Sequence, residues 1–342
     1  TTIPKSSDYF NTKLYTGNNS NNHSITGVGF APDLVWQKIR NGTNYFTMFD
    51  NVRGATKIIY PNSTDAEITS ASGQDSISLD SDGFTLGVST QAGGINNGNC
   101  VAWNWKANGA GSANTDGSIS STVSANTTSG FSIVSWTGNG SASTIGHGLG
   151  STPKMIIIKR LTGGATQWVV YHVSTGNTKA CYLDTTTAPV TVTGFFNNTT
   201  PTSSVFTVGT DTACNGNSNE MIAYCFADVQ GYSKFGSYVG NGNADGTFVY
   251  TGFSPSFVLY KDSTSVSDWV MKDNRRPGFN VTDDVLYPNL ADAEGSGADI
   301  DFLSNGFKAR TTAANTNKSN AGFIYMAFAS EPLVGDNPAT AR

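Results

Sequence analysis

The chain has 342 residues, which is enough for two or three domains that each bury a core of their own. Only 13% of the residues are charged and the net charge is −5, so the surface offers no field that attracts phosphate, and nucleic acid is excluded as a partner. The longest apolar runs, such as Met155–Ile158, are far shorter than the roughly 20 residues of a membrane helix, so we expect no membrane insertion. The first ten residues, TTIPKSSDYF, lack the basic and apolar regions of a Sec-type signal, and we expect synthesis in a cytoplasm.

Three similar turns occur along the chain: YTGNNS from Tyr15, WTGNGS from Trp136 and YVGNGN from Tyr238. In each case a proline follows the first glycine of the turn by 15 positions, at Pro32, Pro153 and Pro255. Asn-Gly supplies the positive φ that a tight turn needs. We therefore expect each turn to form the first hairpin of a repeated unit.

The same series of elements follows each turn. The proline precedes an apolar strand that ends on a lysine, at Lys38, Lys159 or Lys261. An aromatic strand comes next, then a turn before a phenylalanine, and finally a strand that ends on Trp105, Phe226 or Phe328. Short runs rich in β-branched and aromatic residues between Gly and Asn turns are typical of strands, and no window shows a helical period. The sequence predicts an all-β protein of three tandem β-sandwich domains of about 100 residues, lectin-like or jelly-roll-like, with little or no helix.

The repetition sets the expected boundaries. We expect a first sandwich over residues 1–107, a linker rich in Gly, Ser, Asn and Thr over 108–129, a second sandwich over 130–230, a third over 231–332 and a C-terminal tail over 333–342. An alternative for part of the linker, SISSTVSA (118–125), is an added edge strand. The second and third units are joined almost directly, so we expect them to pack rigidly against each other.

The four cysteines, Cys100, Cys181, Cys214 and Cys225, have no metal-type spacing with the histidines at 23, 147 and 172. Buried thiols are the favoured interpretation. A Cys181–Cys214 disulfide remains the alternative.

Few residues suggest catalysis. The best carboxylate pairs for glycan hydrolysis are Asp283 with Asp284 and Asp299 with Asp301, but solvated loop acids are the favoured interpretation. No GxSxG motif presents a nucleophile. His172 ends the second aromatic strand where the other copies have Asp273 and the Phe49–Asp50 pair, which favours a polar strand end; His147 lies in IGHGLG.

Two segments resemble the start of a calcium loop: Asp80-Ser-Asp82-Gly83 and Asn241-Gly-Asn-Ala-Asp245-Gly246. Neither has a glutamate at the twelfth position, and Asx-turns explain both. GNGNADG from Gly240 has some likeness to a phosphate loop but lacks a following helix. We therefore predict no catalytic, cofactor-binding or metal-binding residues and no cofactor.

Exposed aromatic residues with Asn and Asp neighbours would make a sugar platform. Tyr45, Trp168 and Trp269 are the candidates, but their strand positions favour a role in the core. The C-terminal segment SEPLVGDNPATAR (330–342) is a candidate for docking on a neighbouring molecule.

Several long strings carry a family resemblance: FDNVRGA (49–55), DSDGFTLG (80–87), VAWNWKANGAG (101–111), IGHGLGSTPKMIIIKR (145–160), GYSKFGSYVGNGNADGTFVYTGF (231–253) and IYMAFASEPLVGDNPATAR (324–342). Together they resemble a repeated β-sandwich domain family of unknown function found in structural proteins, tail fibres and head appendages, of marine and cyanobacterial tailed bacteriophages. The resemblance implies a non-enzymatic component of the virion surface, made in the bacterial cytoplasm, and assigns no active site.

The resemblance also bears on partners and on the alternative function. It implies a short fibre, knob or capsid decoration that contacts other copies of itself and neighbouring virion proteins, with a homotrimer favoured. Adhesion to host cell-surface glycan and simple coverage of the particle both stay open. The alternative is a virion-associated polysaccharide depolymerase or glycosidase acting on the host envelope.

Overall fold

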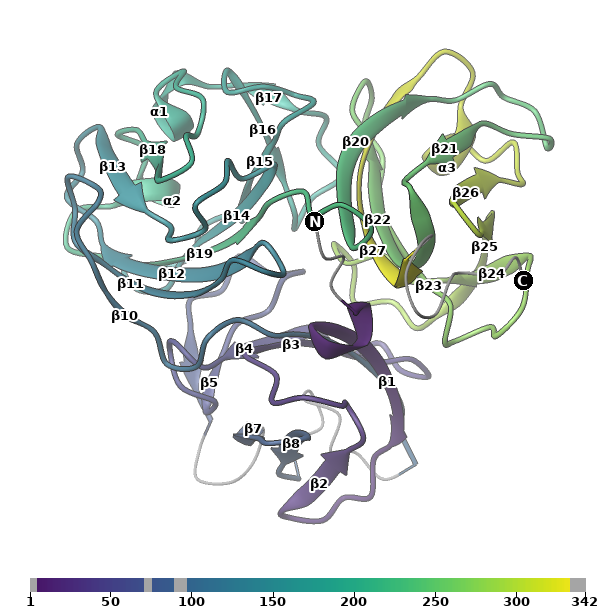
Figure 1. The fold of residues 1–342 in the computed structure, drawn as a ribbon, viewed down its shortest axis with the longest axis horizontal. Coiled ribbons are helices and arrows are strands. Elements are labelled where there is room, and N and C mark those ends of the chain that lie inside the picture. Colours follow the sequence, from purple (N-terminus) through teal and green to yellow (C-terminus); the bar gives the residue numbers. More distant parts are fainter. Residues whose placement is uncertain (1–4, 71–75, 89–96, 333–342) are drawn as a thin grey trace.

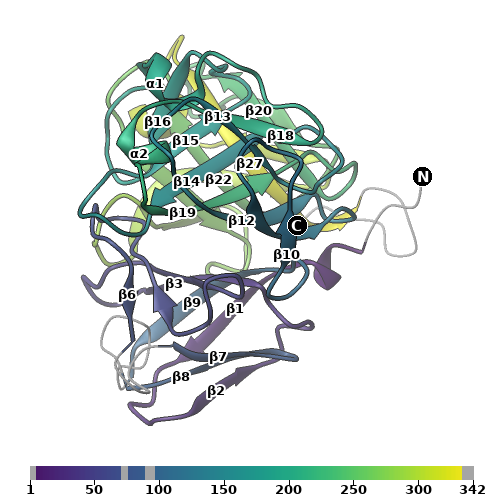
Figure 2. The ribbon, with the colours of Figure 1, turned by 90° about the vertical axis from the view of Figure 1, so that its left-hand side faces the viewer.

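The computed structural model describes residues 5–70, 76–88 and 97–332. Three lobes surround a common centre, and each lobe is one of the three predicted units (Figure 1). The view from the side shows the first unit below the other two (Figure 2). The all-β prediction is confirmed. Helix in the described residues is confined to a 3₁₀ turn, η1 (Ser6–Asp8), and three single turns, α1 (Thr193–Phe196), α2 (Thr212–Asn215) and α3 (Ala314–Asn317).

Each unit has an inner antiparallel sheet that faces the centre of the molecule. Its four main strands have the same order in all three units. The strand that precedes the repeated turn lies beside the last strand of the unit, which is followed by the apolar strand and then by the aromatic strand. They are β1 (Phe10–Thr16), β9 (Asn99–Trp105), β3 (Leu34–Ile39) and β4 (Thr47–Asp50); β12 (Phe131–Thr137), β19 (Glu220–Phe226), β14 (Met155–Arg160) and β15 (Val169–His172); β20 (Ser233–Val239), β27 (Gly322–Pro332), β22 (Phe253–Asp262) and β23 (Trp269–Asp273).

The inner sheet of the second unit is wider than the others. β16 (Lys179–Tyr182) and β17 (Val190–Thr191) extend one side, and β10 (Ser112–Asn114) and β11 (Ser121–Asn126) extend the other. The expectation of a linker over 108–129 was therefore wrong, and the alternative of an added strand is what the structure shows. The segment pairs because Val123 packs in the core of the second sandwich, which a free linker would leave exposed.

An outer sheet closes each sandwich. The outer strands are β2 (His23–Thr26), β8 (Gly83–Leu86) and β7 (Ser76–Asp80); β13 (Ser143–Gly146) and β18 (Val205–Val208); β21 (Phe248–Tyr250), β26 (Gly306–Ala309), β25 (Gly295–Leu303) and β24 (Thr282–Val285). The remaining strands, β5 (Lys57–Ile58) and β6 (Ile68–Thr69), pair with each other. In each unit, the phenylalanine expected after the turn that follows the aromatic strand is buried in the sandwich core. These residues are Phe84, Phe206 and Phe307.

The repeated TGN turns do not form hairpins, contrary to the prediction. Strands β12 and β13 on either side of the second turn lie in different sheets, as do β20 and β21 around the third. The expected positive φ is present, at Gly140 (69°) and Gly242 (70°). The turn therefore carries the chain from one sheet of the sandwich to the other.

A buried asparagine holds the second and third turns in place. Asn215, at the end of α2, donates to Asn139 Oδ1 (2.9 Å) and to the Ser141 carbonyl (2.7 Å) in the second turn. Asn317, at the end of α3, makes the same bonds to Asn241 (2.8 Å) and Asn243 (2.7 Å). A Cβ at Gly138 would lie 2.3 Å from the Gly216 carbonyl oxygen, so only glycine allows this approach.

The three inner sheets share one apolar core. Trp105, Phe226 and Phe328 occupy equivalent positions in the last strand of each unit, and their rings contact one another in pairs with centroids 5.7 to 6.3 Å apart. The units therefore form a closed ring with approximate threefold symmetry inside one chain. No helix in the described part of the chain is long and apolar enough to cross a bilayer.

Candidate functional site

The contact regions between neighbouring units, here called joints, use the three positions that the sequence aligned at the end of the aromatic strand. Asp50 of the first unit accepts a hydrogen bond from the Tyr224 hydroxyl of the second (2.7 Å). Asp273 of the third unit accepts one from the indole N–H of Trp103 in the first (3.1 Å). His172 of the second unit lies 3.1 Å, through Nε2, from a carbonyl of the third. The three contacts form a cycle that closes the ring.

Whether this position holds aspartate or histidine depends on the group that it contacts in the neighbouring unit. The position of Trp103 and Tyr224 is taken in the third unit by Met326, which has no hydrogen-bond donor. The backbone N–H of Ser174 donates to His172 Nδ1 (3.1 Å), so the neutral ring carries its proton on Nε2 and donates it to the Tyr325 carbonyl. Burial lowers the pKa of His172 to about 4. The structure thus fits the polar strand end, and His172 is a joint residue.

Two joints also contain buried ion pairs. At the joint between the first and second units, Arg53 pairs with Asp50 (2.6 Å) and Glu67 (3.1 Å), all three from the first unit. At the joint between the third and first units, Arg276 makes the equivalent pairs with Asp273 (2.6 Å) and Glu294 (2.8 Å), all three from the third unit. A buried charge is tolerated only when it is paired, so these groups are committed to the joints.

The lysines that end the apolar strands are buried as well. Their ammonium groups lie over the rings of Phe46, Trp168 and Trp269 at 5.6 to 5.7 Å from the ring centres. Each also donates to a carbonyl of the neighbouring unit: Lys38 to Ala291 (3.1 Å), Lys159 to Thr64 (3.0 Å) and Lys261 to Thr186 (3.2 Å). Burial lowers the pKa of each of these lysines to about 8. These lysines stabilise the joints and are buried from solvent.

The three aromatic candidates for a sugar platform differ in burial. Trp168 and Trp269 are buried in the shared core, as favoured, and donate through Nε1 to carbonyls of the preceding unit. Tyr45 is not a core residue: its side chain is 38% exposed, and Phe46 takes the equivalent place beside Lys38. Tyr45 precedes β4, which begins at Thr47, so the strand position expected for Tyr45 was wrong.

The remaining candidates have structural partners. His147 is buried and its ring contacts the Thr202 carbonyl (3.2 Å), and burial lowers its pKa. Asp80 accepts from Ser78 and Thr85, both at 2.7 Å, while Asp82 accepts from two backbone N–H groups. No group of three or more His, Cys, Asp and Glu side chains within the described ranges is arranged to hold a metal ion.

The cysteines are buried free thiols, as favoured. Cys181 lies in the shared core and Cys214 in the second sandwich core, so the disulfide alternative is not what the structure shows. Within the tail, residues 333–342 lie outside the described residues, so its docking stays a prediction.

The acids singled out for hydrolysis lie on the third unit. Asp283 and Asp299 line a surface hollow of about 520 Å³ together with Asp245 of the turn segment and Arg310. Asp284 instead faces Arg40 across a joint (3.5 Å), and Asp301 pairs with Arg310 (3.3 Å). The sequence pairs are therefore split, and the hollow combines carboxylates from separate segments.

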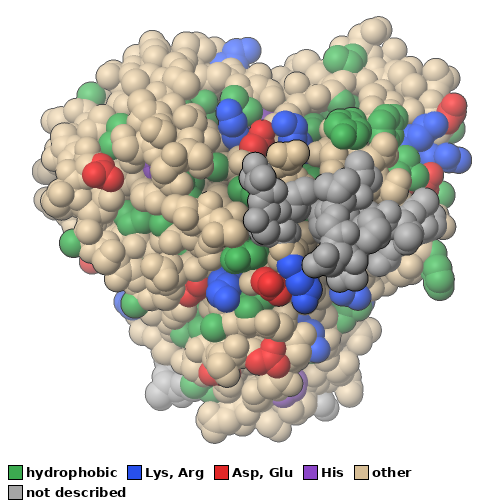
Figure 3. All heavy atoms as spheres, viewed as in Figure 1, with side chains coloured by type: hydrophobic (Ala, Val, Ile, Leu, Met, Phe, Trp, Pro, Cys, Tyr) green, Lys and Arg blue, Asp and Glu red, His purple; other side chains and the backbone are tan. Residues whose placement is uncertain are grey.

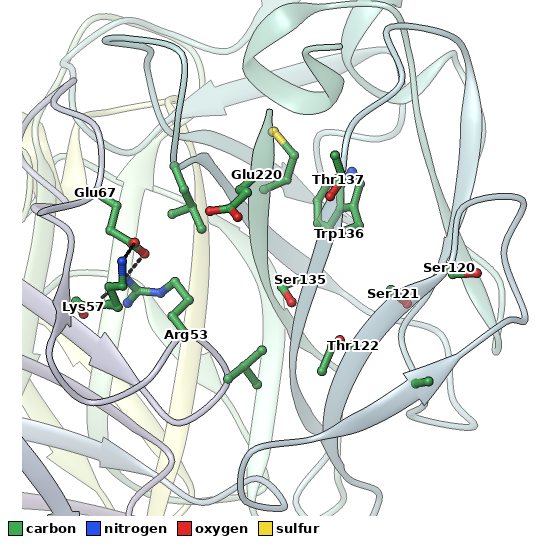
Figure 4. A pocket seen from close by; sticks show the side chains of 14 residues that line it. Arg53, Lys57, Glu67, Ser120, Ser121, Thr122, Ser135, Trp136, Thr137 and Glu220 are labelled. Carbon is green, nitrogen blue, oxygen red and sulfur yellow. Dashed lines mark hydrogen bonds and ion pairs between the residues drawn. The ribbon is translucent and has the colours of Figure 1, made fainter. Parts of the chain in front are cut away.

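A second groove of about 520 Å³ lies along the joint between the first and second units (Figure 4). One side carries Arg53, Lys57 and Glu67. The other is a wall of hydroxyl side chains on or beside β11 and β12, namely Ser120, Ser121, Thr122, Ser135 and Thr137, with Glu220 from β19. Such a lining suits a polar, hydroxyl-rich ligand.

Backbone hydrogen bonds place Glu67 and Glu220 on either side of Leu161. The backbone N–H of Glu67 donates to the Leu161 carbonyl (3.0 Å), and that of Leu161 donates to the Glu220 carbonyl (2.8 Å). Two strand spacings separate the glutamates, about 10 Å between their backbones. Glu67 and Glu220 lie far apart in the chain, and only long-range pairing brings these two into one groove.

Two cations lie beside Glu67 in this groove. Arg53 and Lys57 both lie 3.1 Å from its carboxylate oxygens. The Glu67 carboxylate is therefore engaged in ion pairs at the joint, and the hydroxyl side chains opposite it are what the groove offers to a polar ligand.

A search of curated proteins and a search of solved structures both found no match. A family model described as a domain of unknown function (DUF7483) matches residues 5–332. The match spans all three units. The chain belongs to this DUF7483 family of domains of unknown function.

Proposed function

We propose that the protein is a non-enzymatic structural component of a tailed bacteriophage virion, exposed on the particle surface as a short fibre, knob or decoration that also contributes to adhesion to host glycan. The observation that carries the proposal is the use of the buried ionisable side chains. Asp50, Arg53, Asp273, Arg276 and His172 all contact neighbouring units. These residues build a rigid body, which suits a particle exterior.

The resemblance to phage structural proteins supplies the location, and composition supports it. A surface of hydroxyl and amide side chains on a closed ring resists proteolysis because few backbone segments can open independently. Short loops on such a scaffold vary without loss of the fold.

The direct test is to purify particles of the phage that encodes this chain. Immunogold labelling with antibodies against the chain should mark the particle exterior, and mass spectrometry should detect the chain at a constant copy number per particle. Absence of the chain from purified particles would refute the proposal.

One observation favours the alternative of a depolymerase or glycosidase, namely the groove that contains Glu67 and Glu220. If the groove were catalytic, the protein would release reducing ends from host polysaccharide, and Glu220→Gln would abolish the release while leaving the fold intact. We expect no release from either protein.

The favoured partner is another copy of the chain, with a trimer as the first expectation. The joints already close a ring within one chain, so an assembly of several chains would have to use the outer surfaces. Mass photometry distinguishes a species of 36.0 kDa from one three times as heavy.

A further inference from the structure

The internal symmetry allows the same surface strand to be compared three times. Val249, Ile145 and Ile25 are equivalent because each pairs with the buried phenylalanine of the neighbouring strand. The flanking residues point away from the sandwich core. They are Ser24 and Thr26 in the first unit, Thr144 and Gly146 in the second, and Phe248 and Tyr250 in the third.

The third unit therefore shows two aromatic rings where the fold itself needs none. Phe248 is 44% exposed and Tyr250 60% exposed, and the neighbouring Val239 is also exposed. Exposed aromatic pairs oppose solubility, and on a soluble protein they mark interaction sites. Ser24 and Thr26 show that small polar residues are compatible with the same strand.

The third unit also leaves this strand uncovered. In the second unit, residues 117–119 lie along β13: the Ser118 N–H donates to the Thr144 hydroxyl (2.8 Å) and the Ile119 N–H to the Thr144 carbonyl (3.1 Å). β21 is an edge strand, and no strand of the described residues pairs with its free edge. Its aromatic rings are thus partly exposed and are not covered by a neighbouring strand of the described residues.

A polar hollow adjoins each end of β21. After Tyr250 comes a hollow of about 430 Å³ whose lining includes Asp228, Gln230 and Lys234. Before Phe248 comes the hollow of about 520 Å³ with Asp245, Asp299 and Arg310. Figure 3 shows apolar side chains gathered over the region of β20 and β21, with charged side chains on both sides.

Only some of the polar side chains in the hollow beside Tyr250 are paired with other groups of the described residues. Lys234 and Asp228 pair at 3.2 Å, and Asp228 also accepts from the Phe235 N–H (2.8 Å). Within the described residues, the Gln230 amide and the Tyr250 hydroxyl make no hydrogen bond. Donors and acceptors therefore remain available beside an aromatic ring.

We propose that Phe248, Tyr250 and the two hollows form a binding strip for an extended polysaccharide chain. The C–H faces of sugar rings pack on aromatic rings, whose faces carry partial negative charge, while sugar hydroxyls at the ring edges need hydrogen-bonding partners. Phe248 and Tyr250 are two residues apart on one strand, about 7 Å, so they support successive parts of one chain. The strip deepens the proposed adhesion and rests on that part of the proposed function.

The test uses the double variant Phe248→Ser/Tyr250→Thr, which installs the residues that the first unit has in the same strand. Affinity electrophoresis is run in gels containing bacterial lipopolysaccharide O-chains, bacterial capsular polysaccharide, dextran or alginate, and isothermal calorimetry measures affinity for each polysaccharide that retards the protein. Val266→Thr, a change of an apolar residue of the third unit that is 72% exposed and lies outside the strip, is the matched control. Thermal melting confirms that all variants are folded.

We expect at least one bacterial polysaccharide to retard the natural protein, with an affinity reduced about tenfold or more in the double variant and unchanged in Val266→Thr. Gln230→Ala should weaken binding by a smaller factor. Equal affinity in the double variant would overturn the strip while leaving adhesion through another surface. Absence of retardation by all four would overturn both the strip and the adhesion, whereas the virion location is tested separately by labelling of particles.

Discussion

Replacement of Arg276 with methionine tests whether the joints hold the ring together. The guanidinium is fully buried, donates to Asp273 (2.6 Å), Glu294 (2.8 Å) and the Met271 carbonyl (3.0 Å), and lies over the ring of Trp103 at 5.7 Å. The variant keeps the fully buried Asp273 carboxylate but removes its cation. Breaking one side of a buried pair costs about 3–5 kcal/mol, because the remaining charge is uncompensated.

Urea denaturation followed by tryptophan fluorescence measures this loss, and Arg310→Met is the matched control. Arg310 pairs with Asp301 at 3.3 Å, but its side chain is 42% exposed, so its loss should cost less than about 1 kcal/mol. The double variant Asp273→Asn/Arg276→Met removes the stranded charge and should recover part of the stability. If Arg276→Met and Arg310→Met were equally mild, the joint would not depend on this ion pair and our reasoning would be refuted.

Three further predictions concern the joint histidine, the shared core and the thiols. Burial lowers the pKa of His172 from 6.5 to about 4, so only the unfolded state binds a proton between these values; this contribution is complete above pH 6.5 and falls by about 3 kcal/mol as the pH drops to 4. The variant His172→Asn should lack that part of the pH dependence of unfolding, and an identical slope in both proteins would argue against a neutral buried ring. Phe328→Ala should cost about 3–5 kcal/mol and lower the stability of the whole ring in one transition, whereas a separate early transition in calorimetry would show that the units unfold independently. Because burial raises the pKa of Cys181 to about 12 and the other thiols are also buried, a thiol reagent should label none of the four cysteines in the folded protein and all four in urea; rapid labelling without urea would contradict the burial.

Particular residues show how far sequence reasoning reached. The lysine at the end of each apolar strand was visible as a repeated letter, but burial of a lysine is rare enough that a sequence alone points to a solvated strand end. His172 and Asp273 were correctly aligned, yet the cause of their difference, Met326 in place of a donor, lies in another unit. The TGN turn was correctly recognised as a site of positive φ but wrongly taken for a hairpin, because φ describes one residue and not the sheet to which the next strand belongs.

The candidate binding surfaces were harder to predict. Tyr45, Trp168 and Trp269 were the candidates for an aromatic platform, although their positions favoured the core, while Phe248 and Tyr250 were not among the candidates. Only the comparison of three equivalent strands shows that the fold does not require these two rings.

The sequence by itself determined the all-β class, the threefold repetition and the order of strands in each unit, because strand length, aromatic content and turn residues are local properties that recur with the repeat. The tertiary structure alone decided that the units close into a ring around a shared core, and that the linker expected at 108–129 becomes part of a sheet. Contacts such as Asp50 with Tyr224 join residues 174 positions apart, and no local pattern specifies which surfaces of three similar sandwiches will meet.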